Sequence, residues 1–100
     1  MELFTVIKAK SVEDDLEEIA RFIAEDNPYK ALSFVKEILR DAESALSLFP
    51  TKFKKYKECH VWPYKGYLVF YDVNHESKTV QILLITHSAQ FNKYKHFIDR

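Results

Sequence analysis

Two apolar runs in the second half of the chain constrain the fold more than any other feature. Residues 66–73 read Gly-Tyr-Leu-Val-Phe-Tyr-Asp-Val, and residues 79–86 read Thr-Val-Gln-Ile-Leu-Leu-Ile-Thr. The first run is dominated by β-branched and aromatic residues, which fit a pleated buried surface. The five polar residues between the runs suit a hairpin loop. The pattern therefore predicts two antiparallel strands, with residues 66–73 at the centre of a small sheet.

Two amphipathic helices are predicted before these strands. The first has Ser11 as its N-cap, ends near Asp26 and carries apolar residues at spacings of three and four. Asn27 and Pro28 suit the N-cap and first turn of a second helix, whose apolar stripe continues to Phe49. Because almost no loop separates the two helices, we expect an antiparallel helical hairpin whose stripes cover the sheet.

Weaker patterns complete an α+β domain. Residues 3–10 alternate as an edge strand would, residues 58–62 alternate as a strand that Pro63 should end, and residues 91–98 suit a short C-terminal helix. The predicted order is an N-terminal strand, the helical hairpin, three antiparallel strands and the terminal helix, within a single domain over residues 1–100. The first strand would complete a four-stranded sheet by joining beside the last, although the sequence leaves the strand order open.

The composition is that of a soluble globular protein. Of the 100 residues, 47% are hydrophobic and 30% are charged, and no run approaches the roughly 20 apolar residues of a membrane helix. The chain lacks a Walker loop, CxxC, HExxH and GxSxG, so we expect no cofactor and no metal. The single cysteine and the absence of a basic secretory signal favour the cytoplasm.

The formal net charge of zero conceals an asymmetry. Residues 1–49 contain 6 Lys/Arg and 11 Asp/Glu, whereas residues 50–100 contain 9 Lys/Arg and 4 Asp/Glu. The helical half therefore carries −5 and the strand half +5, which would let the molecule offer a basic face to an acidic partner. The alternative is that the helices are Glu-rich only because they are solvated.

The most basic segment is a candidate for contact with nucleic acid or another target. Residues 51–57 interleave Phe53 and Tyr56 with four lysines, Lys52, Lys54, Lys55 and Lys57. Lysines neutralise phosphates and aromatic rings stack on bases, as single-stranded nucleic-acid sites require. The alternative is a solvated loop that precedes a strand.

His60, His87 and Tyr94 are the candidates for catalysis. Imidazole titrates near neutrality, so the two histidines suit the acid and base of a metal-free phosphodiester cleavage. Tyr94, between Lys93 and Lys95, suits a hydrogen-bond donor to a charged transition state. The alternatives are surface histidines and an amphipathic tyrosine. Cys59 is expected to be a small core residue.

A set of ordered motifs resembles the RelE/ParE superfamily of toxins from bacterial type II toxin-antitoxin modules. The motifs are Asp15-Leu16-x-x-Ile19-x-x-Phe22-Ile23, Asn27-Pro28-x-x-Ala31-x-x-Phe34, Leu48-Phe49-Pro50, Gly66-Tyr67-x-x-x-Tyr71-x-Val73 and Val80-x-Ile82-x-x-Ile85-x-His87. The resemblance implies the strand, helical hairpin and three-stranded sheet predicted above. It also implies a toxin that inhibits growth and a cognate antitoxin, often encoded beside the toxin, which binds it and masks its working face in a hetero-oligomer.

The resemblance implies one of two targets. RelE-like members cleave messenger RNA on the ribosome with basic residues on the sheet, whereas ParE-like members block DNA gyrase and are not nucleases. Here the positions where basic residues are expected hold Leu68, Cys59 and Val61, and Ser88-Ala89-Gln90 follows His87 without an arginine. This favours ParE-like inhibition of gyrase, with RNA cleavage by His60, His87 and Tyr94 as the second hypothesis.

Two further predictions concern binding surfaces. Leu68 and Phe70 would form an exposed apolar groove for the antitoxin, while Gln90 and the four lysines of residues 51–57 would contact the target. The third hypothesis is a binding module that keeps the toxin fold without toxicity.

Overall fold

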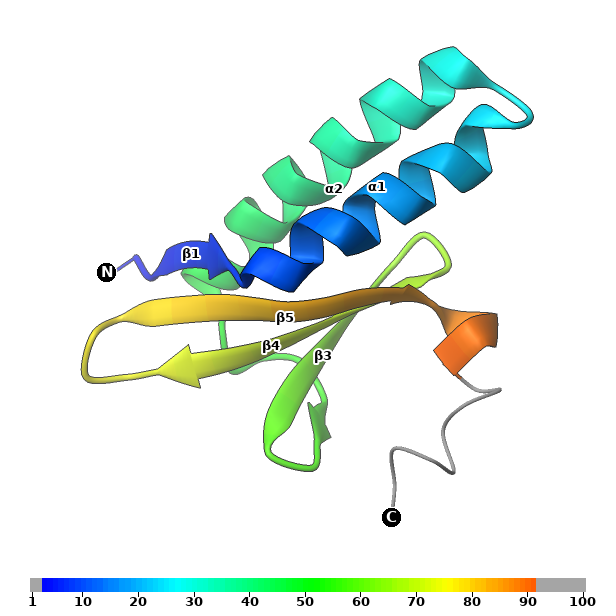
Figure 1. Ribbon diagram of the computed structural model, residues 1–100. Helices are drawn as coiled ribbons and strands as arrows, with labels where there is room; N and C mark the ends of the chain where they lie inside the picture. Colours follow the sequence, from blue (N-terminus) through cyan, green and yellow to red (C-terminus); the bar gives the residue numbers. More distant parts are fainter. Residues whose placement is uncertain (1–2, 92–100) are drawn as a thin grey trace.

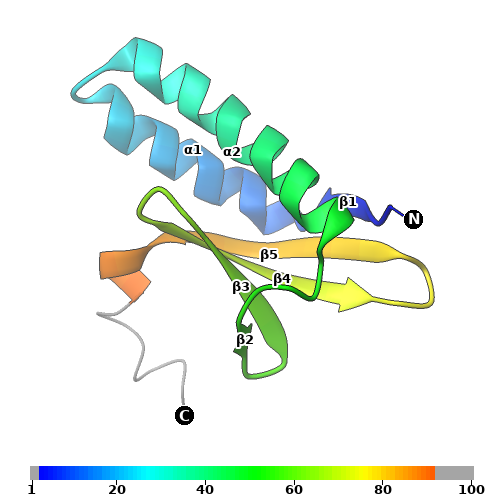
Figure 2. The same cartoon turned by 180° about the vertical axis from the view of Figure 1, so that it is seen from behind.

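In the computed structural model, which describes residues 3–91, a hairpin of two helices lies across one face of a five-stranded sheet (Figure 1, Figure 2). The helices are α1 (Lys10–Ala24) and α2 (Pro28–Leu48). The strands are β1 (Thr5–Lys8), β2 (Lys55–Tyr56), β3 (Cys59–Tyr64), β4 (Tyr67–Asn74) and β5 (Thr79–His87). The predicted α+β class and the element order are confirmed. A helical turn covers residues 88–91, and the rest of the expected C-terminal helix lies outside the described residues.

The strand order is β1-β5-β4-β3-β2. β1 runs parallel to β5, from Thr5 opposite Thr79 to Lys8 opposite Ile82, and the other neighbours are antiparallel. A parallel pair needs a long crossover, which the helical hairpin supplies. The first strand thus joins beside the last, which settles an order that the sequence left open, and the two-residue β2 is an addition that the sequence pattern did not reveal.

The start of α1 differs from the prediction. Its N-cap is Ala9, which has an extended backbone and no side-chain cap, so Ser11 lies inside the helix. The N–H of Ala9 donates to the carbonyl of Ile82 at 2.8 Å. The last contact between β1 and β5 therefore fixes where the helix begins, two residues before the side-chain signal. The helix also ends at Ala24, before the predicted Asp26.

The predicted boundaries of α2 are confirmed. Asn27 is its N-cap, and the side-chain oxygen accepts a hydrogen bond from the backbone N–H of Lys30 at 3.1 Å. Pro28 occupies the first turn, where its missing N–H costs nothing. The helix ends at Leu48, just before Pro50.

β3 continues through Pro63 to Tyr64, so the prediction that Pro63 ends this strand was wrong. β2 pairs with β3 only at Cys59 and His60. Beyond these residues β3 is an edge strand on that side, in the part of the chain that the structure describes. An edge strand accepts a residue without an N–H, because only one of its sides needs ladder hydrogen bonds.

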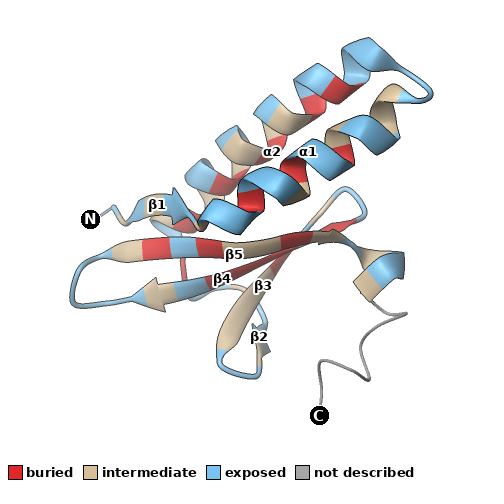
Figure 3. Ribbon diagram, viewed as in Figure 1, coloured by how far each residue is buried: buried red, intermediate tan, exposed pale blue. Residues whose placement is uncertain are grey.

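The hydrophobic core lies between the hairpin and the sheet (Figure 3). The inner faces of the helices bury apolar side chains against β3, β4 and β5, and the central residues are Val12, Leu16, Ile38, Leu46, Val69, Tyr71, Val80 and Ile82. The hydroxyl of the fully buried Tyr71 donates to the carbonyl of Pro50 at 2.7 Å. Burial raises the pKa of Tyr71 to about 12.

A β-bulge explains an irregular apolar pattern in β5. Phe70 lies opposite Leu84 and Tyr71 lies opposite Ile82, so Leu83 is an extra residue in the ladder. The extra residue shifts the alternation of faces by one position. Val80, Ile82 and Ile85 therefore all join the core under the helices.

Candidate functional site

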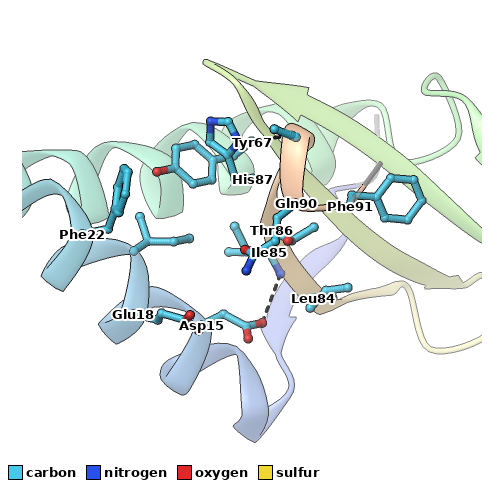
Figure 4. Close-up of a pocket in the computed structure, with 12 residues that line it drawn as sticks. Asp15, Glu18, Phe22, Tyr67, Leu84, Ile85, Thr86, His87, Gln90 and Phe91 are labelled. Atoms are coloured by element: carbon cyan, nitrogen blue, oxygen red, sulfur yellow. Dashed lines mark hydrogen bonds between the residues drawn. The ribbon is translucent and has the colours of Figure 1, made fainter. Parts of the chain in front are cut away.

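A cavity of about 540 Å³ lies between α1 and the C-terminal part of β5 (Figure 4). α1 contributes Asp15, Glu18, Ile19 and Phe22 to its wall, and Tyr67 of β4 also lines it. The other lining residues come from the end of β5 and the turn that follows it: Leu84, Ile85, Thr86, His87, Ala89, Gln90 and Phe91. The cavity thus combines apolar walls with a few polar groups, which is the usual character of a binding site.

The cavity exists because β1 is short. β1 ends at Lys8, opposite Ile82, so α1 rather than a strand lies beside the rest of β5. Asp15 of α1 takes the place of the backbone acceptor that a neighbouring strand would provide. Its Oδ2 accepts a hydrogen bond from the N–H of Ile85 at 3.1 Å (Figure 4). Burial raises the pKa of the Asp15 carboxyl, the nearby charges of Glu18 and Asp14 raise it further, and the hydrogen bond from Ile85 opposes the rise.

His87 lies at the rim of this cavity. Its ring meets the ring of Tyr67 edge to face, with the centroids 5.2 Å apart. Its Nδ1 accepts a hydrogen bond from the N–H of Ala89 at 3.1 Å, so the ring caps the turn of residues 88–91. Gly66, at φ +85°, passes close to this ring: a Cβ at Gly66 would lie 3.9 Å from Nε2 of His87. Gln90 is exposed and lines the same cavity.

The structure does not bring His60 and His87 together. His60 pairs with Tyr71 on one side of β4, whereas His87 pairs with Tyr67 on the other side. The four-residue offset along β4 alone corresponds to roughly 13 Å. His60 instead stacks on Tyr71, with the ring centroids 5.4 Å apart, and burial, more than the positive charge of Lys55, lowers its pKa. Tyr94 lies outside the described residues.

In the basic segment of residues 51–57 the lysines are exposed, and the rings of Phe53 and Tyr56 pack against other aromatic residues. Lys52, Lys54, Lys55 and Lys57 are exposed, and Nζ of Lys52 lies over the rings of Phe49 and Phe53 at 5.4 and 5.8 Å. Phe53 packs against Trp62, and Tyr56 packs against Phe70 and Phe91. The four lysines are therefore exposed to solvent, whereas both rings are half-buried against other rings.

The face of the sheet that the helices leave uncovered contains a second cavity, of about 520 Å³. Its lining includes Cys59, Phe70, Leu84, Phe91 and Lys57. Phe70 is only 5% exposed, because Tyr56 and Phe91 cover its ring. The expectation that Phe70 lies on an exposed groove was therefore wrong, and Leu68, which is half-buried, is the accessible member of the pair.

Cys59 and Val61 are half-buried in β3, beside this second cavity. Val61 lies opposite Phe70, and Sγ of Cys59 contacts the carbonyl oxygen of Tyr56 at 3.2 Å. Burial raises the pKa of the Cys59 thiol, which disfavours the reactive thiolate. Among the described residues, the second cavity therefore combines apolar walls with one lysine, Lys57, and two carboxylates, Glu58 and Asp72.

The sequence pattern missed the role of Asp15, Glu18 and Phe22 in the first cavity. A signal was present for Asp15, which follows Val12 by three positions and precedes Ile19 by four. A carboxylate at that spacing lies on the apolar face of the helix rather than on its solvated face. For Phe22 the sequence contained no such signal: its 66% exposure, beside the buried Ile19 and the partly buried Ile23, is seen only in the structure.

Within residues 3–91, no group of three or more His, Cys, Asp or Glu side chains is placed to hold a metal ion. No helix among these residues is both long and apolar enough to cross a membrane.

Comparison with protein families places most of the chain in one of them. The model of the ParE toxin of the type II toxin-antitoxin system parDE matches residues 6–90. No curated protein matches the chain. The match includes both helices and all five strands that the structure describes except the first residue of β1.

Several solved structures have the same fold. The toxin-antitoxin complex RelBE2 from Mycobacterium tuberculosis aligns with a TM-score of 0.67 and 20% identity, over 89% of this chain and 95% of the other. The chromosomal ParDE system from P. aeruginosa aligns with a TM-score of 0.70 and 16% identity, over 85% and 96%. A mutant of the E. coli toxin RelE, in complex with a peptide of the antitoxin RelBc, aligns with a TM-score of 0.52 and 12% identity, over 93% and 94%.

Proposed function

We propose, from the premise that this chain belongs to the ParE toxin family of type II toxin-antitoxin systems, that it arrests growth by blocking DNA gyrase without cleaving nucleic acid. In this proposal a cognate antitoxin binds the chain and keeps it inactive in a hetero-oligomer. The antitoxin proposal draws support from the toxin-antitoxin complexes that share the fold.

The observation that carries the choice of target is that the uncovered sheet face lacks cations at the positions where cleavage would need them. Cleavage of RNA needs cationic donors where negative charge develops on the phosphate. The three positions where the superfamily pattern expects basic residues hold Leu68, Cys59 and Val61. Phe70 lies opposite Val61 in the sheet, and its ring packs against the rings of Tyr56 and Phe91. A surface of this kind suits binding to a protein better than phosphodiester chemistry.

The separation of the two histidines is consistent with this choice. An acid and a base that act on one phosphodiester must both lie within hydrogen-bond reach of it. His60 and His87 lie on opposite sides of β4 with a four-residue offset. In the proposed mode the exposed lysines Lys52, Lys54, Lys55 and Lys57 contact the target electrostatically, and Gln90 contacts it directly.

Ribosome-dependent cleavage of messenger RNA is the second candidate. It is supported by Lys57, which lines the second cavity, and by the exposed imidazole of His87. In that case His60, His87 and Tyr94 would be the residues to examine first.

The experiment is induced expression of this chain alone, with transcript integrity and DNA supercoiling measured in the same arrested cells. Loss of supercoiling with intact transcripts is the expected result. Purified gyrase should also lose supercoiling activity when the purified chain is added. Rapid transcript cleavage with normal supercoiling would overturn the proposal in favour of the second candidate. Normal growth, together with binding of the protein from the neighbouring gene, would indicate a binding module without toxicity.

A further inference from the structure

The outer edge of β5 is only half covered by β1. β1 pairs with β5 from Thr79 to Ile82, and within residues 3–91 no strand lies along this edge from Leu84 to His87. An uncovered edge presents backbone N–H and C=O groups that can pair with another extended chain. The cavity beside α1 lies directly along this uncovered part of β5 (Figure 4).

The hydrogen bonds show which backbone groups of β5 point toward its uncovered edge. The N–H of Ile85 points outward, because it donates to Asp15 of α1. The N–H of Ser88 points the other way, because it donates to the carbonyl of Gly66 at 2.9 Å. Backbone groups alternate in direction along a strand. The carbonyl of Ile85 and the N–H of His87 therefore point toward the uncovered edge.

The side chains around this edge define the chemistry of an occupant. Ile19 and Leu84 line the cavity together with Phe22, whose side chain is 66% exposed although it is large and apolar. Among residues 3–91, the charged residues of the lining are Asp15 and Glu18, and both are acidic. An occupant with an apolar side chain and a basic side chain would complement both features.

We propose that an extended segment of the antitoxin adds to β5 as a strand that continues the line of β1. Its backbone pairs with the carbonyl of Ile85 and the N–H of His87. One of its apolar side chains enters the cavity against Phe22, and a Lys or Arg lies beside Glu18. This inference rests on the proposed function, since it assumes that an antitoxin exists, and it places the antitoxin on the opposite side of β5 from Leu68.

A second copy of this chain is a poorer occupant than the antitoxin. Two copies joined through this edge about a two-fold axis would present the same surface to each other. Asp15 and Glu18 of one copy would then face Asp15 and Glu18 of the other. The like charges would repel, whereas a basic segment from a different protein would be attracted.

The test measures binding of the protein encoded by the neighbouring gene to the full chain, by calorimetry with purified components. Glu18→Lys and Phe22→Ser should each weaken binding by about tenfold or more, because they remove the acidic and apolar contacts. The matched controls are Glu43→Lys and Leu32→Ser on α2. Both control residues are exposed and neither lines the cavity, so each should change the dissociation constant by less than about twofold.

Hydrogen exchange of the same complex provides a readout that does not depend on substitution. The amide of His87 should exchange more slowly in the complex than in the free chain, because it gains a hydrogen-bond acceptor. The amide of Ser88, which already bonds to Gly66, should change little.

The outcomes separate this inference from the proposed function. If wild type does not bind the neighbouring protein, this inference and the antitoxin part of the proposed function are overturned, whereas the block of gyrase is decided separately by the supercoiling assay. If binding is intact in Glu18→Lys and Phe22→Ser but weakened in Leu68→Asp, the antitoxin occupies the uncovered sheet face and only this inference fails. If the free chain forms a dimer that Phe22→Ser dissociates, a second copy covers the edge and the inference also fails.

Discussion

The carboxylate of Asp15 in α1 accepts a hydrogen bond from the backbone N–H of Ile85 in β5, across 70 positions of the sequence. This bond connects the helical layer to the sheet at the point where β1 no longer covers β5. It also forms one wall of the cavity in which we place the antitoxin. The stability of the domain and the shape of its candidate binding site therefore depend on the same contact.

The first prediction concerns this contact. Asp15→Ala should lower the free energy of unfolding by about 1–3 kcal/mol, because it leaves the N–H of Ile85 without its acceptor. Asp15→Asn keeps an acceptor oxygen and should cost less. Urea unfolding of the purified variants measures both effects, and Asp14→Ala, at an exposed neighbour, should stay within about 0.5 kcal/mol. Equal effects at Asp14 and Asp15 would contradict the structural role of the bond.

The pH dependence of Asp15 follows from its raised pKa. The folded pKa lies above the ordinary value of 3.8, so the folded state binds the proton more tightly than the unfolded state does. The stabilisation due to this group is fully present below pH 3.8 and is lost as the pH rises through the folded pKa. Wild type should therefore lose stability relative to Asp15→Asn as the pH rises across this window. A gain in stability instead would contradict a raised pKa of Asp15.

The second prediction separates two tyrosines whose pKa values are both raised to about 12. The pKa of Tyr64 is raised mainly by the hydrogen bond that its hydroxyl donates to Asp41, whereas burial raises that of Tyr71. Asp41→Ala should therefore bring the pKa of Tyr64 down toward 10 and leave that of Tyr71 unchanged. Carbon NMR of labelled tyrosine rings below the alkaline unfolding transition follows each residue separately. An equal shift at both would indicate a general loosening of the fold.

The third prediction concerns the aromatic cluster on the uncovered sheet face. Phe70→Ala should lower the free energy of unfolding by about 3–5 kcal/mol, because the ring is buried under Tyr56 and Phe91. Phe22→Ala is the control, since Phe22 is 66% exposed and its truncation should cost less than about 0.5 kcal/mol. Thermal or urea unfolding of the two variants gives the comparison. A small effect at Phe70 would mean that its ring is an accessible binding surface after all.

These contacts show which parts of the fold could be predicted from the sequence. Local signals located the elements: Asn27 and Pro28 started α2, and the apolar runs of residues 66–73 and 79–86 became β4 and β5. Such signals depend on neighbouring residues only, so they can be read from a pattern. The fold was therefore predictable except for the strand order, the short β2 and the precise ends of α1 and β3.

The candidate site was less predictable because it depends on distant pairings. Leu83 and Leu84 are both apolar, so no alternation marks the bulge that turns Ile85 toward the core. The role of Asp15 follows from the point at which β1 ends, which no local pattern gives. Phe70 and Leu68 had the same sequence signal, and only the rings of Tyr56 and Phe91 distinguish the buried residue from the accessible one.

The fourth prediction tests the basic segment. The double variant Lys54→Ala with Lys55→Ala should weaken inhibition of purified gyrase by about tenfold at low salt and less at high salt, because exposed charges are screened. Lys30→Ala with Lys36→Ala removes the same charge from an exposed part of α2 and should leave inhibition unchanged. Equal losses in the two double variants would indicate an effect of net charge alone rather than a contact surface.

The last prediction concerns the histidines and separates the two targets. His60→Phe keeps the ring that stacks on Tyr71, and His87→Asn keeps an acceptor for the N–H of Ala89 because asparagine is a good helix cap. Each variant removes a group that can transfer a proton without removing its structural contact. If the chain blocks gyrase, both variants should arrest growth as wild type does when they are expressed to the same level. If it cleaves RNA with these residues, loss of an acid or base should slow cleavage by about 10²–10⁴-fold, and arrest should disappear while antitoxin binding persists.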